Sequence, residues 1–341
     1  MKINNNPEMQ AFFERCFFHM GNEEINDYIG VTFLPEQEKE LQYELAEVGA
    51  IEFQGPESEW PSLYISTEEY LKTAYQSHIQ LDQIKSDTFE FRKQTMPPYT
   101  LFNVSVIQED PNRELNDSLM LRALDAPYEA AVLLQDGEYW MSDTPQEANT
   151  IDPFAKKAHG KVAVFGLGIG YFVYNALLNP NVEKVCVVEY SQEVIDMFTK
   201  YLLPQFPRGG DVEIIHGDAF DYFNEEFLSK YDYCFTDIWK SNGDGFEMIQ
   251  RMLEGYLPEH EKVDFWIEST CCNFISSMMC VYFHSLANDM ELEHEDPELQ
   301  KIYHKIDQYF SAKDITVEDH SVLQEYMYDP YVIREILAIN I

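Results

Sequence analysis

Three glycines at alternate positions follow a short apolar run in the middle of the chain. The run is Val162 to Phe165, and the glycines are Gly166, Gly168 and Gly170. A glycine loop between a strand and a helix lets a ligand approach the backbone closely, and N–H groups at the helix start face an open crevice. Such a loop can also arise from packing alone. By itself it is therefore weak evidence for a nucleotide site.

Acidic side chains end the next three apolar runs. Glu189 lies 23 residues after Gly166, the spacing at which a carboxylate binds two ribose hydroxyls. Asp218 is followed by the small residue Ala219 and can reach an adenine amino group, while Asp237 places a carboxylate at the crevice mouth. Each acid has an alternative interpretation, as a solvated strand-end acid for Glu189 and as a turn cap for the two aspartates.

The elements that must position these residues alternate from Lys161 onward between apolar runs and helical patterns, as in a parallel sheet with helices on both faces. One helix is expected to begin in the glycine loop and the next after Ser191. The expected strands are Val162–Phe165, Lys184–Val188, Val212–Ile215, Tyr233–Thr236 and Val263–Ile267. The segments expected to be helical after the last strand are about 272–287, 297–310, 317–327 and 330–339, with no hairpin among them.

Two further regions precede this pattern. Residues from about 7 to 95 have mostly helical apolar spacings, and residues 98–142 hold short strand-like runs with Asp136-Gly137 as a hairpin turn. We therefore predict an α/β fold with a Rossmann-like, doubly wound, mostly parallel sheet, a preceding small antiparallel β unit, and helical N- and C-terminal extensions. The expected domains are a helical region at 1–97, the antiparallel unit at 98–149, the Rossmann-like domain at 150–286 and the helical extension at 287–341.

Over about residues 150–270 the strand ends resemble the motifs of class I S-adenosylmethionine-dependent methyltransferases. VFGLGIG is similar to their first motif, VVEYS to their second, IIHGDAF to their third and YDYCFTDIW to their fourth. The resemblance implies S-adenosylmethionine as cofactor and Asp237 as the catalytic residue, facing the sulfonium or the acceptor. The other cofactor-binding residues that it implies are Gly166, Leu167, Gly168 and Gly170 at the methionine and ribose, Glu189 at the ribose hydroxyls, Tyr190 beside the adenine, and Asp218 with Ala219 at the adenine amino group.

A dehydrogenase that binds a nicotinamide dinucleotide is the competing interpretation of a glycine-rich strand-turn-helix unit. Its fingerprint GxGxxG requires a glycine at position 171, where this chain has Tyr171. The spacing GxGxG and the later segments HGDA and TDIW favour adenosylmethionine.

The layout also resembles spermidine synthase, in which a small β unit precedes the same nucleotide domain. The segment LLQDGEYWMSDTPQE is similar to the strand-turn-strand of that enzyme, but the chain departs from it soon afterwards. Trp140 replaces a cofactor-contacting glutamine, Ile169 an aspartate of the glycine loop, and Lys240 the second aspartate of the catalytic loop. Aminopropyl transfer is therefore the alternative hypothesis. A non-catalytic binding protein is a third, because the helical flanks are long and no C-terminal hairpin is expected.

We accordingly expect a direct methyl transfer to a small nucleophile, in which Asp237 orients an amine or takes its proton. The substrate is a small molecule of unidentified structure. Trp140, Glu147 and Trp239 are the predicted substrate-binding residues because they lie near the expected cofactor edge. Trp239 has an equally good alternative as a core residue.

The composition limits the partners. Among 341 residues, 61 acidic and 23 basic side chains give a formal charge of −38, which disfavours nucleic acid and favours a cationic substrate. The charge also suffices to explain solubility alone. No apolar run is long enough to span a membrane, and the six cysteines have no CxxC spacing. We therefore expect a cytoplasmic protein with no metal and no membrane partner; the oligomeric state stays open, with a homodimer as one option.

Overall fold

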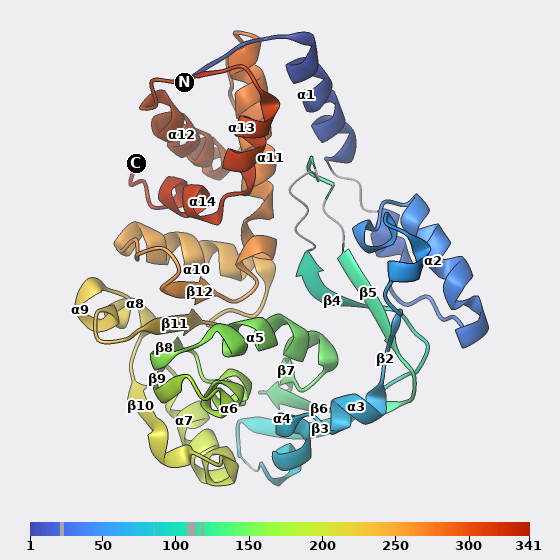
Figure 1. Cartoon of the computed structure of the whole chain (residues 1–341). Coiled ribbons are helices and arrows are strands. Elements are labelled where there is room, and N and C mark those ends of the chain that lie inside the picture. Colours follow the sequence, from blue (N-terminus) through green and yellow to red (C-terminus); the bar gives the residue numbers. More distant parts are fainter. Residues whose placement is uncertain (21–23, 85, 108–113, 117–118) are drawn as a thin grey trace.

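The computed structural model of the chain describes residues 1–20, 24–84, 86–107, 114–116 and 119–341. Figure 1 shows the parallel sheet with its helices at the lower left, the antiparallel strands to the right, and the C-terminal helices with α1 at the top. The residues that the sequence predicts for the site lie mainly where the first two of these regions meet.

The central sheet has five parallel strands in the order β10-β9-β8-β11-β12. The chain starts in the middle, moves to one edge, and then crosses back to the other side of the first strand. The winding therefore reverses between β8 and β11, where sheets of this type place their ligands. The strands are β8 (Gly160–Phe165), β9 (Val182–Glu189), β10 (Val212–His216), β11 (Tyr233–Thr236) and β12 (Val263–Phe265). The Rossmann-like doubly wound fold and its five strands are confirmed, with small shifts at the strand ends.

Helices cover both faces of this sheet. Successive side chains of a strand point to opposite faces. Accordingly, Val162 and Val164 of β8 belong to one hydrophobic core, and Ala163 and Phe165 belong to another. The first core is covered by α5 (Pro145–Lys157), α6 (Tyr171–Leu178) and α7 (Gln192–Met197). The second is covered by α8 (Ala219–Tyr222), α9 (Glu225–Leu228), α10 (Asn242–Gly255) and α11 (Glu268–Ala287). Burial on both faces explains why β8, β9 and β11 contain continuous apolar runs.

Two three-stranded sheets precede the parallel sheet, in the orders β2-β5-β4 and β3-β6-β7. The predicted hairpin is confirmed: β6 and β7 pair antiparallel, and its turn residues Asp136 and Gly137 have φ angles of 53° and 86°. The strands are β2 (Tyr64–Ile65), β3 (Phe89–Met96), β4 (Phe102–Ile107), β5 (Leu119–Leu124), β6 (Tyr128–Gln135) and β7 (Glu138–Ser142).

Strand β3 lies in the segment where the apolar spacing predicted helix, and that prediction is wrong there. It pairs antiparallel with β6 from Phe89 opposite Gln135 to Met96 opposite Tyr128. Most of its side chains are exposed, so its sequence carries little alternation of apolar and polar residues. The pairing with β6, which covers an otherwise open sheet edge, decides its conformation.

The remaining N-terminal segments are helical or irregular. The helices there are α1 (Pro7–His19), α2 (Glu38–Glu47), α3 (Thr67–Leu71) and α4 (Ala74–His78). Helix α1 shares a core with α11 and the C-terminal helices, whereas α2 belongs to a separate small core. Strand β1 (Lys2–Ile3) also pairs with β13 (Thr316–Val317). The first twenty residues therefore pack with the end of the chain.

The helices expected after the fifth strand are present. Besides α11 they are α12 (Pro297–Ser311), α13 (His320–Tyr328) and α14 (Pro330–Leu337). The buried Arg334 of α14 pairs with Glu268 at the start of α11, which ties the C-terminal layer to the end of the parallel sheet. Within the described ranges, no helix is both long and apolar enough to cross a membrane.

Candidate functional site

The glycine loop joins β8 to α6 in a conformation that favours glycine. Gly166, Gly168 and Gly170 have φ angles of +90°, +52° and +73°. A Cβ on Gly166 would collide with the backbone carbonyl of Asp237, and a Cβ on Gly168 would lie 2.7 Å from Met141 Cε. The glycines therefore let the loop pack directly against the end of β11 and against β7. This close packing places the backbone of the loop at the carboxyl ends of the parallel strands.

Glu189 ends β9 beside this loop and binds it. Its Oε2 accepts a hydrogen bond from Leu167 N at 2.9 Å, and its Oε1 accepts one from Ser191 N at 2.7 Å. Burial raises the pKa of Glu189, and these backbone donors oppose the shift. An ionised carboxylate has about four acceptor positions. Two backbone bonds therefore leave acceptor capacity for a ligand.

Asp218 begins α8 as its N-cap. Its Oδ1 accepts a hydrogen bond from Phe220 N at 3.0 Å, so the alternative interpretation as a turn cap describes a real contact. Asp218 and Ala219 also line a cavity. The capping bond uses one carboxylate oxygen, and the other Asp218 oxygen keeps its acceptor positions.

The residues at the strand ends surround one cavity of about 460 Å³, which we call the strand-end cavity. This volume lies within the range of about 300–1,000 Å³ that is typical of small-molecule sites. The predicted site residues that line it are Gly166, Leu167, Gly168, Glu189, Tyr190, Asp218, Ala219, Asp237, Trp140 and Trp239. Gly170 is instead the N-cap of α6 behind the loop. Tyr190 is 74% exposed and forms part of the rim.

Asp237 follows β11 directly. Its backbone N donates to Phe165 O at 2.9 Å, which fixes it beside the end of β8. Burial raises the pKa of Asp237 to about 8, and the nearby charge of Glu147 adds to the shift. No donor in the described part of the chain hydrogen-bonds its carboxylate. The Asp237 carboxyl therefore has a pKa near neutral pH and borders the strand-end cavity. In the described part of the chain it has no hydrogen-bond donor.

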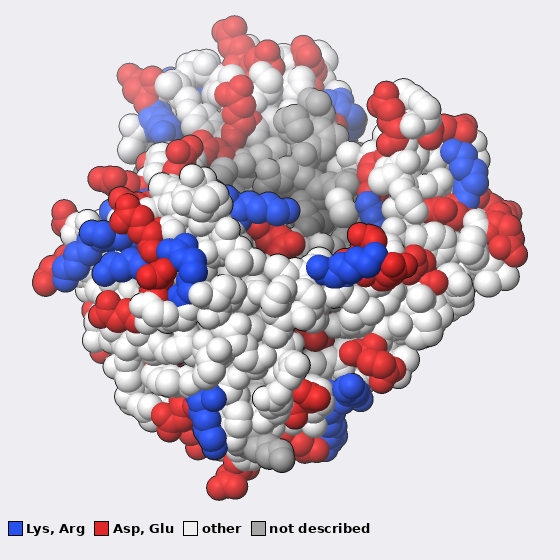
Figure 2. All heavy atoms as spheres, turned by 60° about the horizontal axis from the view of Figure 1, so that its bottom comes forward, with Lys and Arg blue, Asp and Glu red and all other residues white. Residues whose placement is uncertain are grey.

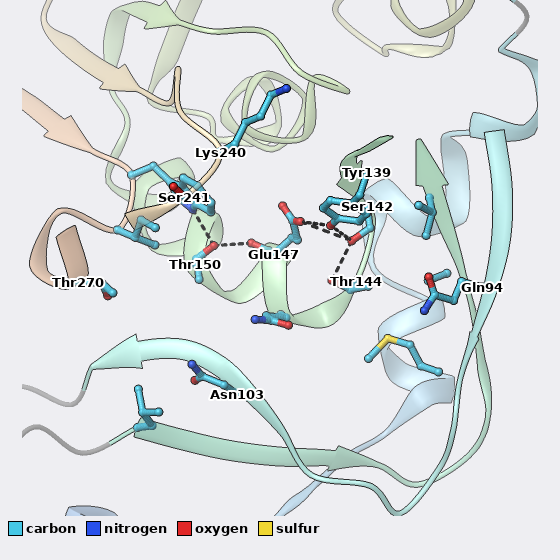
Figure 3. A pocket seen from close by; sticks show the side chains of 17 residues that line it. Gln94, Asn103, Tyr139, Ser142, Thr144, Glu147, Thr150, Lys240, Ser241 and Thr270 are labelled. Carbon is cyan, nitrogen blue, oxygen red and sulfur yellow. Dashed lines mark hydrogen bonds between the residues drawn. The ribbon is translucent and has the colours of Figure 1, made fainter. Parts of the chain in front are cut away.

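Glu147 lines a second cavity of about 420 Å³, which we call the side cavity (Figure 3). Its Oε1 accepts hydrogen bonds from Tyr139 OH at 2.9 Å and from Ser142 Oγ at 3.5 Å. Burial raises the pKa of Glu147, and these bonds oppose the shift. The side cavity lies between the antiparallel strands, α5 and the segments that follow β11 and β12.

A bulge in β7 helps to separate the two cavities. Leu133 of β6 pairs with Met141, and Leu134 pairs with Tyr139, so Trp140 is the additional residue. As a result, Trp140 and Met141 both line the strand-end cavity, while Tyr139 lines the side cavity. Trp140, predicted to bind substrate, thus lies on the strand-end side of the bulge.

Trp239 also lines the strand-end cavity, but most of its ring is in the core. Its side chain is buried, and its ring centroid lies 6.4 Å from that of Phe265. A Cβ on Gly245 would lie 2.8 Å from its Nε1, and this Nε1 has no hydrogen-bond partner in the described structure. The indole N–H therefore faces α10, which agrees with the core alternative for this residue.

Sequence patterns did not single out several residues at the site. Lys240 lines both cavities, whereas the sequence indicated only that it departs from the spermidine synthase pattern. Arg251 of α10 lies over the Phe220 ring at 3.8 Å, and both residues line the strand-end cavity. No motif marks α10, because it reaches the cavity only through packing against the sheet.

Tyr75 of α4 supports the glycine loop from behind. Its hydroxyl donates to Ile169 O at 2.8 Å, and its fully buried ring lies 4.8 Å from the Tyr171 ring. Burial raises the pKa of Tyr75, so the hydroxyl stays a donor. A segment 94 residues earlier in the chain thus holds the loop, and no sequence spacing could indicate this.

One face of the surface and the cysteines were candidates for a further site among the described residues. Figure 2 shows acidic and basic side chains interspersed on one face of the molecule. All six cysteines are free and buried, and the described residues contain no group of three His, Cys, Asp or Glu placed to hold a metal ion. The cavities are therefore the places where we look for function.

Comparisons with known proteins find similarity to this chain in structure only. No protein-family model matches the chain, and no curated protein matches it. Its structure is similar to spermidine synthase from Thermotoga maritima, with 14% identity and a TM-score of 0.29 over 56% of this chain and 66% of that one.

Two other solved structures are similar over part of the chain. A candidate SAM-dependent methyltransferase from Streptococcus mutans is 13% identical, with a TM-score of 0.26 over 41% of this chain and 43% of that one. A candidate caffeoyl-CoA O-methyltransferase from Staphylococcus aureus is 16% identical, with a TM-score of 0.27 over 49% and 73%. The chain thus spans less than two thirds of the first two proteins. All three TM-scores are low, so the fold class rests on the strand order of this chain itself.

Proposed function

We propose that this chain is an S-adenosylmethionine-dependent methyltransferase that acts on a small amine. The observation that carries the proposal is the strand-end cavity, where the glycine loop and the acids Glu189, Asp218 and Asp237 meet at the point where the sheet winding reverses. A cavity at this place, with carboxylates from three successive strand ends, suits a ligand that has both hydroxyl and amino donors.

The residues present fit an adenosine-containing cofactor. Glu189 is fixed by two backbone N–H groups and keeps free acceptor positions for the two ribose hydroxyls. Asp218 has a free oxygen for the adenine amino group, and the exposed Tyr190 offers a ring face at the rim. The glycine loop brings backbone to the cavity wall without side chains. These residues would hold the cofactor, with the loop beside its methionine part.

S-adenosylmethionine, when bound, would supply a methyl group on a sulfonium. Transfer of this group to an amine forms a C–N bond and breaks the C–S bond, whose electron pair goes to sulfur. One proton is released from the amine. The protein must align the amine, exclude water and accept that proton. Asp237 is suited to the last task, because its raised pKa of about 8 is close to that of a useful base near neutral pH. A bound ammonium would favour the ionised form of Asp237 and leave it ready to take a proton.

Isothermal titration of the purified chain tests the proposal. S-adenosylmethionine, S-adenosylhomocysteine and decarboxylated S-adenosylmethionine are titrated separately, after mass spectrometry of the native protein for a carried-over cofactor. We expect micromolar binding of the first two compounds. Absence of binding by both at millimolar concentration contradicts the proposal, and a clear preference for the decarboxylated compound points to aminopropyl transfer instead.

A further inference from the structure

Among the described residues that line the side cavity, one is acidic and one is basic. They are Glu147 and Lys240, and the other polar lining groups are uncharged hydroxyls and amides. Lys240 is the residue that the side cavity shares with the strand-end cavity in the described structure. The side cavity therefore has an acidic group in its wall and a basic group where it adjoins the strand-end cavity.

The acidic end of the cavity is suited to one ammonium group. Glu147 accepts from the hydroxyls of Tyr139 and Ser142 with one oxygen, Oε1, and an ionised carboxylate has about four acceptor positions, so acceptor capacity for a ligand remains. The pKa of the neighbouring Asp237 is raised to about 8 by burial, and the charge of Glu147 adds to this shift. Near pH 7 Asp237 is therefore mostly protonated, and the two carboxyls together carry at most about one negative charge.

The basic end is suited to an anionic group. Lys240 is exposed, and in the described part of the chain it has no ion-pair partner. Figure 3 shows its side chain extending away from the Glu147 carboxylate, and no ion pair joins the two residues in the described structure. A lysine on a flexible stem can follow an anionic group at the cavity mouth.

Neutral groups hold the space between the charged ends. Trp266 Nε1 donates to Thr150 Oγ1 at 2.8 Å, and this bond fixes an aromatic ring and a hydroxyl in the cavity wall. Gln94 and Asn103 reach the cavity from β3 and β4. Such a wall accommodates a short polar or aliphatic chain without adding charge.

We infer that the acceptor bound in the side cavity is zwitterionic, with an amine placed at Glu147 and a carboxylate or other anionic group placed at Lys240. This inference rests on the proposed function, since it names the acceptor class of the same site. A diamine is disfavoured, because its second ammonium would meet the like charge of Lys240.

Matched acceptors of equal chain length test this inference. The protein, loaded with S-adenosylhomocysteine, is titrated with ω-amino acids from 3-aminopropanoate to 6-aminohexanoate and with the diamine of the same carbon count. We expect the best ω-amino acid to bind at least about tenfold more tightly than its diamine, which corresponds to about 1.4 kcal/mol. The variant Lys240→Gln should remove most of this preference, and Lys240→Glu should reverse it.

Lys230→Gln is the control, because Lys230 is exposed in the turn after α9 and lines neither cavity. It should keep the preference of the unchanged protein. If S-adenosylhomocysteine binds but no ω-amino acid binds better than its diamine, the inference is wrong while the proposed function stands. If S-adenosylhomocysteine itself does not bind, the proposed function fails first.

Discussion

The two cavities are built from the chain in different ways. The strand-end cavity takes its acids and its glycine loop from consecutive strand ends, each within a few residues of a recognisable motif. The side cavity combines residues of β3, β4, β7 and α5 with segments after β11 and β12, which lie far apart in the sequence. Local motifs thus specify one cavity, while tertiary packing creates the other. Substitutions should accordingly affect cofactor binding at the first and acceptor choice at the second.

The largest effect is expected from Gly166→Ala. The φ angle of +90° strains any other residue, and the new Cβ would collide with the Asp237 carbonyl, which is backbone and cannot turn aside. We expect a loss of about 2–4 kcal/mol in the free energy of unfolding and no measurable cofactor binding. Chemical denaturation and titration measure both.

Gly210→Ala is the matched control for this change, because a Cβ there has no neighbour within 4 Å. It should leave the denaturation midpoint and the cofactor affinity nearly unchanged. Equal stability of the two variants would show that the conformation of the loop does not require glycine at position 166, which would contradict this prediction.

Asp237→Asn should separate chemistry from stability. With an acceptor from the titration series, we expect the transfer rate to fall by about 100-fold or more, since proton acceptance is lost. The affinity for S-adenosylhomocysteine should change less than about threefold if Asp237 acts on the acceptor. An unchanged transfer rate would exclude Asp237 as the base.

The same variant has a predictable dependence of stability on pH. The pKa of Asp237 is raised to about 8, so between pH 4 and pH 8 the folded chain binds more protons here than the unfolded chain, and stability falls as pH rises. Asp237→Asn removes this loss of stability at higher pH, because the amide does not titrate. Its Tm should exceed that of the unchanged protein by about 2–5 °C at pH 8 and by little at pH 5. A gain of equal size at both pH values would contradict the raised pKa.

Glu189→Gln tests whether the strand-end cavity binds the cofactor. The amide cannot accept from both Leu167 N and Ser191 N, since one of its two groups is a donor. We expect cofactor affinity to fall by about 10–100-fold, with a smaller change in acceptor preference. The exposed Glu193→Gln, at the start of α7, is the control and should keep the affinity. Equal affinities in the two variants would remove Glu189 from the proposed site.

Tyr75→Phe should have the smallest effect. It removes one hydrogen bond to Ile169 O behind the glycine loop without changing the ring, which costs about 1 kcal/mol. We expect cofactor affinity to fall several-fold at an unchanged maximal rate. Tyr174→Phe is the control, because its hydroxyl bonds to Ala74 O at 3.3 Å outside the loop. A similar loss of affinity in both variants would indicate general destabilisation rather than support of the loop.

The sequence by itself determined the parallel sheet and the acids at its edge. Strands buried on both faces are continuous apolar runs, and the ends of parallel strands share one edge, so Glu189, Asp218 and Asp237 could be predicted to meet. The sequence indicated less clearly what each residue contacts. Asp218 both caps α8 and lines the cavity, and the indole N–H of Trp239 points into the core.

Only the tertiary structure decided what surrounds this edge. Strand β3 has an exposed, charged sequence and becomes a strand because β6 offers it an edge. The bulge at Trp140, the support from Tyr75 and the position of Lys240 between two cavities depend on segments that are distant in sequence. Sequence periodicity indicates which face of an element is buried, but not which other element covers that face. The side cavity is formed by contacts of this second kind.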